Sequence, residues 1–187
     1  MKPCVAFSGG GQGDGTVNIL ILQGSPRANG NTVWMAEEYR KAAEAAGHKA
    51  TLVDVAHKKI AGCMACGYCR GKGAGACIQK DDMQMLYPLL EKAEVLVLAA
   101  PIYYFTLSAQ IQAPIQRIYN MQKPPKLKKM ALLASSYSPN VYDGAIGEYQ
   151  GILKYWGVED TGVVTAKIDE QKTDATRGRI LDLVKAL

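Results

Sequence analysis

The chain has 187 residues, 48% of them hydrophobic, and its 22 Lys and Arg against 17 Asp and Glu give a formal net charge of +5. This length supports one well-packed domain, and no run of about 18 apolar residues is present to span a membrane. The basic residues are scattered rather than interleaved with aromatics, which argues against nucleic-acid binding. The start of the chain lacks the pattern of a signal peptide, so we expect a cytoplasmic protein.

Residues 1–16 have a composition of their own, because five of the seven residues from Gly9 to Gly15 are glycine. Their spacing matches neither phosphate-loop fingerprint, and no helix pattern follows them. We therefore expect a flexible Gly-rich N-terminal arm over 1–16 and a single domain over 17–187.

The next stretch predicts a strand, a loop and a helix. Residues 17–22 form an apolar run typical of a strand buried on both faces of a parallel sheet, and residues 31–47 have helical spacing that ends at Gly47. The small and polar loop between them, 24–32, offers free N–H groups and the positive end of a helix dipole, which suit a phosphate group. The alternative is an ordinary turn with Asn31 or Thr32 as N-cap.

The glycine spacing distinguishes between classes of phosphate-containing ligand. A Walker loop needs Gly-x4-Gly-Lys-Ser/Thr, whereas five residues separate Gly24 from Gly30 and Asn31 stands in place of the lysine. The dinucleotide fingerprint is absent too, so a single phosphate monoester fits better. No cysteine lies in this loop, which argues against a phosphatase with a Cys-x5-Arg nucleophile.

The loop sequence Gly24-Ser25-Pro26-Arg27-x-Asn29-Gly30-Asn31-Thr32 resembles that of the flavodoxin-like NAD(P)H-dependent FMN reductase family, and in particular its iron-sulfur flavoprotein branch. The resemblance covers 17–187 by order of elements, with specific motifs at 24–32, 63–82 and 101–117. It implies that the loop holds the FMN phosphate, with contacts from Ser25, Arg27, Asn29, Gly30, Asn31 and Thr32.

Residues 49–55 predict a second strand, and the long loop over 56–80 that follows it carries the cysteines Cys63-x2-Cys66-x2-Cys69-x7-Cys77. Three thiols at successive x2 spacing and a fourth further along can ligate a 4Fe-4S cluster, and the resembled branch has a similar compact motif. Free or structural thiols remain an alternative, as do a zinc ion and a redox disulfide.

A helix with Asp81 as its N-cap is predicted next, and residues 94–100 read as the most apolar strand, at the centre of the sheet. The residues directly after that strand resemble the family's second flavin loop, where aromatic faces stack on the isoalloxazine. They are Pro101, Ile102, Tyr103, Tyr104 and Phe105. The alternative is that the three aromatics simply cap the core.

The remaining pattern completes a doubly wound sheet. It predicts helices over 107–121, 145–156 and 173–187 and strands over 129–134 and 160–166. The resulting fold class is α/β, a flavodoxin-like three-layer fold with five parallel strands in the order 2-1-3-4-5. In that order the loop 135–140 brings Ser135 to the flavin edge. The helix over 107–121 keeps the Arg117 of the resembled family.

The resemblance implies an FMN-dependent oxidoreductase that transfers electrons from NAD(P)H to a small-molecule or protein acceptor, as a homodimer or higher homo-oligomer. We expect no catalytic acid or base, because the flavin carries the chemistry. A one-electron carrier with a 4Fe-4S cluster on Cys63, Cys66, Cys69 and Cys77 is the alternative function. The sequence leaves open the acceptor and the choice between NADH and NADPH.

Overall fold

The structure is a computed structural model that describes residues 15–187; the expected N-terminal arm lies outside the described residues except for Gly15 and Thr16. Its strands are β1 Asn18–Gln23, β2 Lys49–Asp54, β3 Val95–Tyr103, β4 Thr106–Leu107, β5 Lys129–Ser135 and β6 Glu159–Ala166. Its helices are α1 Asn31–Ala45, α2 Met83–Lys92, α3 Ala109–Arg117, α4 Asp143–Trp156 and α5 Asp174–Lys185, with 3-10 turns η1 Tyr68–Arg70 and η2 Ile118–Asn120.

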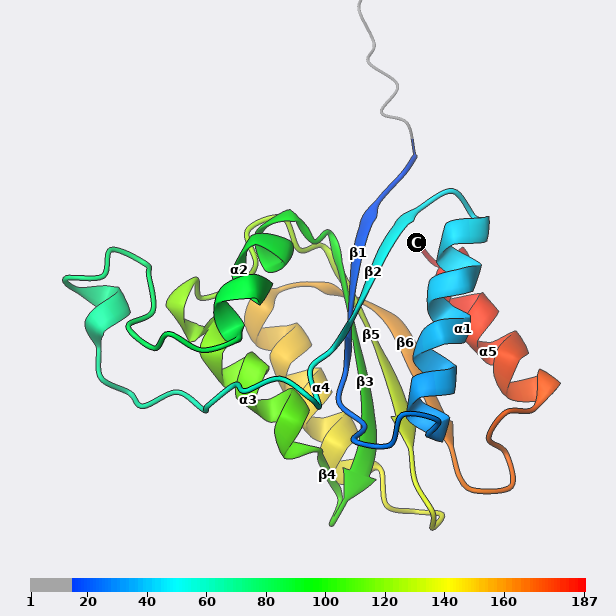
Figure 1. The fold of residues 1–187 in the computed structure, drawn as a ribbon. Helices are drawn as coiled ribbons and strands as arrows, with labels where there is room; N and C mark the ends of the chain where they lie inside the picture. The colour runs from blue at the N-terminus through cyan, green and yellow to red at the C-terminus, as the bar shows by residue number, and fades with distance from the viewer. Residues whose placement is uncertain (1–14) are drawn as a thin grey trace, which may run out of the picture.

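Five parallel strands form the sheet in the order β2-β1-β3-β5-β6 (Figure 1). This is the predicted order 2-1-3-4-5, so the predicted fold class is confirmed. The short β4 pairs antiparallel with the end of β3 and was not expected. None of the helices in residues 15–187 is long and apolar enough to cross a membrane.

The central strands are buried on both faces because successive side chains enter two different cores. Leu20 and Leu96 pack with α2, α3 and α4, whereas Ile21 and Val97 pack with α1 and α5. Each such side chain contributes about 1.5–3 kcal/mol when fully buried. This double burial explains why the strands read as continuous apolar runs in the sequence.

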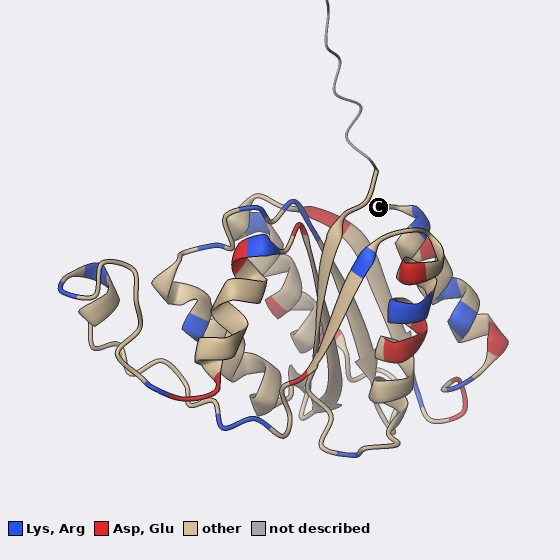
Figure 2. Cartoon of the chain, turned by 45° about the horizontal axis from the view of Figure 1, so that its top comes forward, with Lys and Arg blue, Asp and Glu red and all other residues tan. Residues whose placement is uncertain are grey.

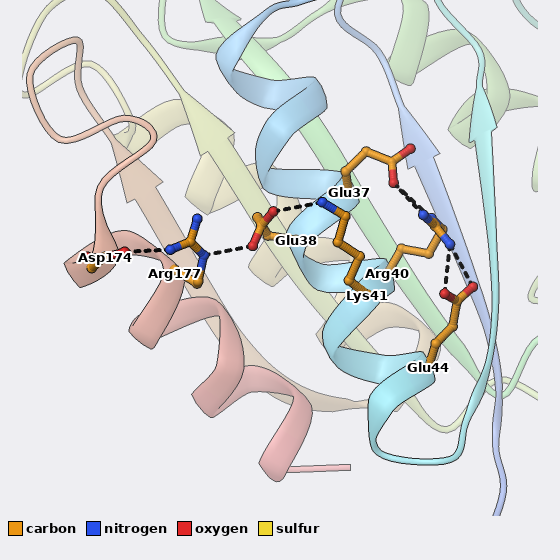
Figure 3. Close-up of polar contacts among 7 residues, drawn as sticks. All are labelled: Glu37, Glu38, Arg40, Lys41, Glu44, Asp174 and Arg177. Carbon is orange, nitrogen blue, oxygen red and sulfur yellow. Dashed lines mark hydrogen bonds and ion pairs between the residues drawn. The ribbon is translucent and has the colours of Figure 1, made fainter.

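Two helices of one layer are joined by ion pairs (Figure 3). Arg177 of α5 donates from Nε to Glu38 Oε2 of α1 at 2.8 Å, and Lys41 lies 3.2 Å from the other oxygen of Glu38. The Arg177 guanidinium also lies 5.5 Å from the ring centre of Trp34. Because the Arg177 side chain is 42% exposed, these contacts align α1 and α5 more than they stabilise them.

Two local expectations are wrong. Residues 101–103 are not loop: β3 runs on to Tyr103 and turns back through β4. α2 begins at Met83 with Asp82, not Asp81, in the N-cap position, although the Asp81 carboxylate still accepts from the Met83 N–H at 3.2 Å. The same carboxylate also forms an ion pair with Arg117, 2.6 Å away, which joins distant parts of the chain.

Candidate functional site

A cavity of about 220 Å³ opens where β1, β3 and β5 end, as a switch point in a doubly wound sheet requires. The loops that follow these strands and β6 meet at this end of the sheet, the lower end in Figure 1. Its lining residues are Ser25, Arg27, Gly30, Asn31, Thr32, Pro101, Ile102, Tyr103, Ser135, Ser136, Tyr137, Ile168 and Gln171. The structure therefore brings together nine of the twelve residues that the sequence predicts for FMN.

The first turn of α1 is arranged for an anion. Its N-cap is Gly30, no side chain accepts a hydrogen bond there, and no acidic residue lies in the first turn. Ser25 and Thr32 are buried, and the Thr32 hydroxyl lies 2.6 Å from that of Ser135. The alternative of an ordinary turn capped by Asn31 or Thr32 is therefore wrong, and the free helix end suits a phosphate.

Internal hydrogen bonds fix the shape of this loop. The buried side chain of Gln23 accepts from the Ser25 N–H, and the Gly30 N–H donates to the Arg27 carbonyl at 2.9 Å. A Cβ at Gly30 would lie 2.9 Å from that same carbonyl oxygen, and one at Gly24 would lie 2.3 Å from Ile111 Cγ1. Both glycines are needed because neighbouring atoms approach the backbone too closely for a side chain.

The loop between β6 and α5 closes the cavity, and the sequence analysis missed it. Gln171 accepts from the Asn31 side-chain amide and donates to the carbonyls of Ser136 at 2.7 Å and Ala166 at 3.0 Å. Lys172 donates to the Asn29 carbonyl at 3.2 Å, so Asn29 lies outside the cavity lining but is held beside it. Ile168 was missed as well, whereas Ser136 and Tyr137 belong to the loop 135–140 that was expected at this edge, although only Ser135 was singled out there. The topology alone pointed to this loop, because it leaves the same sheet edge.

The β3–β4 hairpin presents aromatic side chains beside the cavity. Tyr103, Tyr104 and Phe105 are 49%, 96% and 52% exposed, so the alternative that they cap the core is wrong. Tyr104 and Phe105 have φ angles of 46° and 68°, a left-handed backbone that costs non-glycine residues of order 1–3 kcal/mol each. These two residues line an adjoining groove of about 240 Å³ rather than the first cavity. Strain of this kind is typical of functional sites.

The four cysteines of the loop over 56–80 line a second cavity, of about 680 Å³, between that loop and residues 116–120. This loop projects from the body of the protein beside α3 (Figure 1) and carries Lys and Arg but no acidic residue (Figure 2). Cys63 and Cys66 are exposed, Cys69 and Cys77 half-buried, and all four are free thiols. The two cavities share no lining residue.

The four thiols of this second cavity are the ligand type that a 4Fe-4S cluster uses, and they are not gathered around a single ion. Within residues 15–187 no three His, Cys, Asp or Glu side chains converge on one point, but the ligands of a 4Fe-4S cluster bind four different iron atoms. Burial acts to raise the pKa of the Cys77 thiol, yet the Gln79 amide and the Arg117 guanidinium bring it below its ordinary value. Arg117 also lines the cavity, and its buried Nε has no hydrogen-bond partner within residues 15–187.

Comparison with solved structures supports the fold. The structure of RosB with a bound flavin-type intermediate superposes with a TM-score of 0.75 at 15% identity, covering 91% of this chain and 77% of that one. The apo structure of an NADH:FMN oxidoreductase gives a TM-score of 0.65 at 17% identity, covering 91% and 87%.

Comparison with curated sequences gives closer relatives. An "iron-sulfur flavoprotein" of Archaeoglobus fulgidus is 33% identical over 146 residues, which are 75% of this chain and 64% of the relative. Another, from Methanosarcina thermophila, is 30% identical over 54% of this chain and 52% of its own length. The chain thus spans about half to two thirds of these relatives. Residues 17–160 match the family model described as NADPH-dependent FMN reductase, and the chain belongs to this family.

Proposed function

We propose that this protein is an FMN-dependent oxidoreductase that takes electrons from NAD(P)H. The observation that carries the proposal is the uncapped start of α1 in a cavity at the switch point of the sheet. There the N–H groups of α1 and the hydroxyls of Ser25 and Thr32 would bind the FMN phosphate. When bound, FMN supplies hydride and single-electron chemistry.

The chain's own residues would bind the FMN phosphate, orient the ring system and shield it from water. Arg27 adds an exposed positive charge at the phosphate end, and Gln171 holds the phosphate loop against the loop after β5. Tyr103, Tyr104, Phe105 and Tyr137 provide aromatic faces for the ring system. No acid or base is assigned, because positioning rather than proton transfer is the task of these residues. We also include a homo-oligomer in the proposal, because the resemblance described above implies one.

The test is an FMN titration of the apoprotein. Ser25→Ala, Thr32→Val and Arg27→Gln should each weaken binding, by about 1.5–3 kcal/mol for a charge-assisted contact and by less for the solvent-exposed Arg27. Arg40→Gln, on the outer part of α1, is the matched control and should bind FMN normally. Stopped-flow mixing with NADH and NADPH then identifies the donor. Undiminished FMN affinity in all three variants would mean that the phosphate binds elsewhere.

A second function, one-electron transfer through a 4Fe-4S cluster, is favoured by the four cysteines around one cavity and by its similarity to proteins named iron-sulfur flavoproteins. Anaerobically purified protein should then contain iron and acid-labile sulfide. Changing Cys63, Cys66, Cys69 or Cys77 to Ser should remove both, whereas Cys4→Ser should not. If protein from anaerobic cells supplied with iron contained no iron and were still active with NAD(P)H, the cluster proposal would be refuted and only the reductase function would remain.

A further inference from the structure

Arg117, at the end of α3, is the one charged side chain among the buried residues of the described chain, at 1% exposure. Its Nη1 donates to Asp81 Oδ2 at 2.6 Å and its Nη2 to Asp81 Oδ1 at 3.1 Å, a bidentate pair. Nη1 also donates to the Ala61 carbonyl at 3.0 Å. One guanidinium therefore contacts residues on either side of the cysteine segment.

The two sides of that segment are also bonded to each other. The Ala61 N–H donates to Asp81 Oδ2 at 3.0 Å, and the Gln79 amide donates to the Gly62 carbonyl at 3.1 Å. One step further out, Lys59 and Asp82 exchange two hydrogen bonds, of 2.7 and 3.1 Å. Residues 61–81 thus form a closed loop whose neck is fastened to α3 by Arg117.

The tip of the loop contacts the residues that follow Arg117. Unlike the buried Arg117 at the neck, the side chains of Arg70 and Tyr119 in these contacts are exposed. Arg70 donates to the Tyr119 carbonyl at 2.8 Å and lies 4.5 Å from the centre of its ring, and Asn120 donates to the Gly75 carbonyl at 2.9 Å. Tyr119 is 54% exposed. Arg70 and Arg117 therefore carry the same charge and contact the same loop, but Arg117 is buried and Arg70 is exposed. This difference makes Arg70 a matched control for Arg117.

We propose that Arg117 is the positioning residue of the cysteine loop: it fastens the neck of the loop to α3 before any metal binds, and it provides a fixed positive charge beside the thiols. Arg117 lines the cavity, and its buried Nε has no hydrogen-bond partner among the described residues, so it is a donor that a sulfur or sulfide acceptor could satisfy. The site would thus take an anionic, thiolate-ligated group. This second part rests on the proposed cluster, whereas the first part does not.

Hydrogen exchange of the metal-free protein tests the fastening. Arg117→Gln should speed exchange in peptides covering 61–81 by about tenfold or more, since opening then needs less free energy. Arg117→Lys keeps the charge but loses the bidentate geometry, so its exchange should also rise, by less. Arg70→Gln, which removes the same charge at the surface, should change exchange by less than about threefold. Equal exchange in Arg117→Gln and Arg70→Gln would overturn the proposal.

Reconstitution with iron and sulfide tests the charge. Arg117→Lys should retain a cluster with nearly the wild-type midpoint potential, whereas Arg117→Gln should hold less iron, with any remaining cluster shifted to a more negative potential. Identical potentials in the two variants would overturn the role of the charge. If the wild-type protein takes up no iron, the proposed cluster is refuted. The hydrogen-exchange measurement would still test whether Arg117 fastens the neck of the loop to α3.

Loss of Arg117 leaves the half-buried Asp81 without its charged partner, which can destabilise the fold. The double variant Asp81→Asn with Arg117→Gln removes both charges and keeps the test decisive if the single variant does not fold. FMN affinity and the thermal midpoint check the fold of each variant, because the FMN cavity shares no lining residue with the cysteine cavity.

Discussion

Two adjacent residues, Tyr104 and Phe105, combine a left-handed backbone with highly exposed aromatic side chains. A two-residue hairpin loop with positive φ at both positions normally carries Asn-Gly. Aromatics in that turn cost stability, and no core packing compensates for Tyr104, which is 96% exposed. We therefore expect the benefit to lie outside the folding energy, in the proposed binding of FMN at the adjoining cavity.

Replacing the pair by Tyr104→Asn and Phe105→Gly should raise the free energy of unfolding by about 1–3 kcal/mol, because the backbone strain is relieved. The same variant should bind FMN more weakly, since two aromatic faces are lost. Urea unfolding and FMN titration measure the two effects. Tyr104→Ala, the control, removes a ring without easing the strain and should weaken FMN binding only. Unchanged stability of the double variant would contradict this explanation.

Local pattern predicted the residues that act through their own loop, and not those that act through distant contacts. Ser25 and Thr32 follow from the strand, loop and helix around them. Gln171 could not be found in this way, because its role depends on Asn31, 140 positions away. For Asp81 the sequence indicated a contact with the start of α2, which the hydrogen bond from the Met83 N–H provides, but it did not reveal that Arg117 lies against the same carboxylate.

Among the elements, the five parallel strands were predictable because double burial makes them continuous apolar runs. The two-residue β4 was not, since no glycine or asparagine marks its turn. The cysteine loop was predicted to be functional from its length and its thiols, and this stays a prediction. Its attachment to α3 was invisible, because hydrogen bonds to backbone carbonyls such as that of Ala61 leave no trace in residue type.

The contact between α1 and α5 predicts a pH dependence of stability. Burial acts to raise the pKa of Glu38, but Arg177 and Lys41 outweigh it and hold that pKa below the usual 4.5. A lowered pKa in the folded state means stability that is present above pH 4.5 and is lost as pH falls through the folded value. Glu38→Gln should therefore flatten the acid limb of a thermal-midpoint profile.

The matched control for this experiment is Glu44→Gln, because Glu44 forms an exposed ion pair with Arg40 within the same helix. It removes the same charge from α1 without changing a contact to α5. The thermal midpoint of Glu44→Gln should therefore fall with decreasing pH more nearly as the wild type does than that of Glu38→Gln. The difference will be modest, because solvent reaches the Arg177 side of the contact. Coincident profiles for wild type and Glu38→Gln would show that α1 and α5 are held by packing alone.

In the whole molecule, α3 connects the two cavities. Ser108, just before it, donates to the Gly24 carbonyl at 3.1 Å at the start of the phosphate loop, and Arg117 at its other end fastens the cysteine loop. The helix has nine residues, so it is about 13 Å long. A rigid element of that length fixes the spacing of the two loops, whichever partner or subunit completes the electron path.

The domain expected over 17–187 can be tested by truncation. The family match begins at residue 17, and the first strand, β1, begins at Asn18. Deleting residues 1–14 should therefore leave the thermal midpoint and the FMN affinity at their wild-type values. Deletion through Ile21 removes most of β1 from the sheet and should abolish folding, which makes it the control. Weaker FMN binding by the shorter deletion would make the Gly-rich segment part of the flavin site, because its glycine N–H groups are the feature there that suits a phosphate.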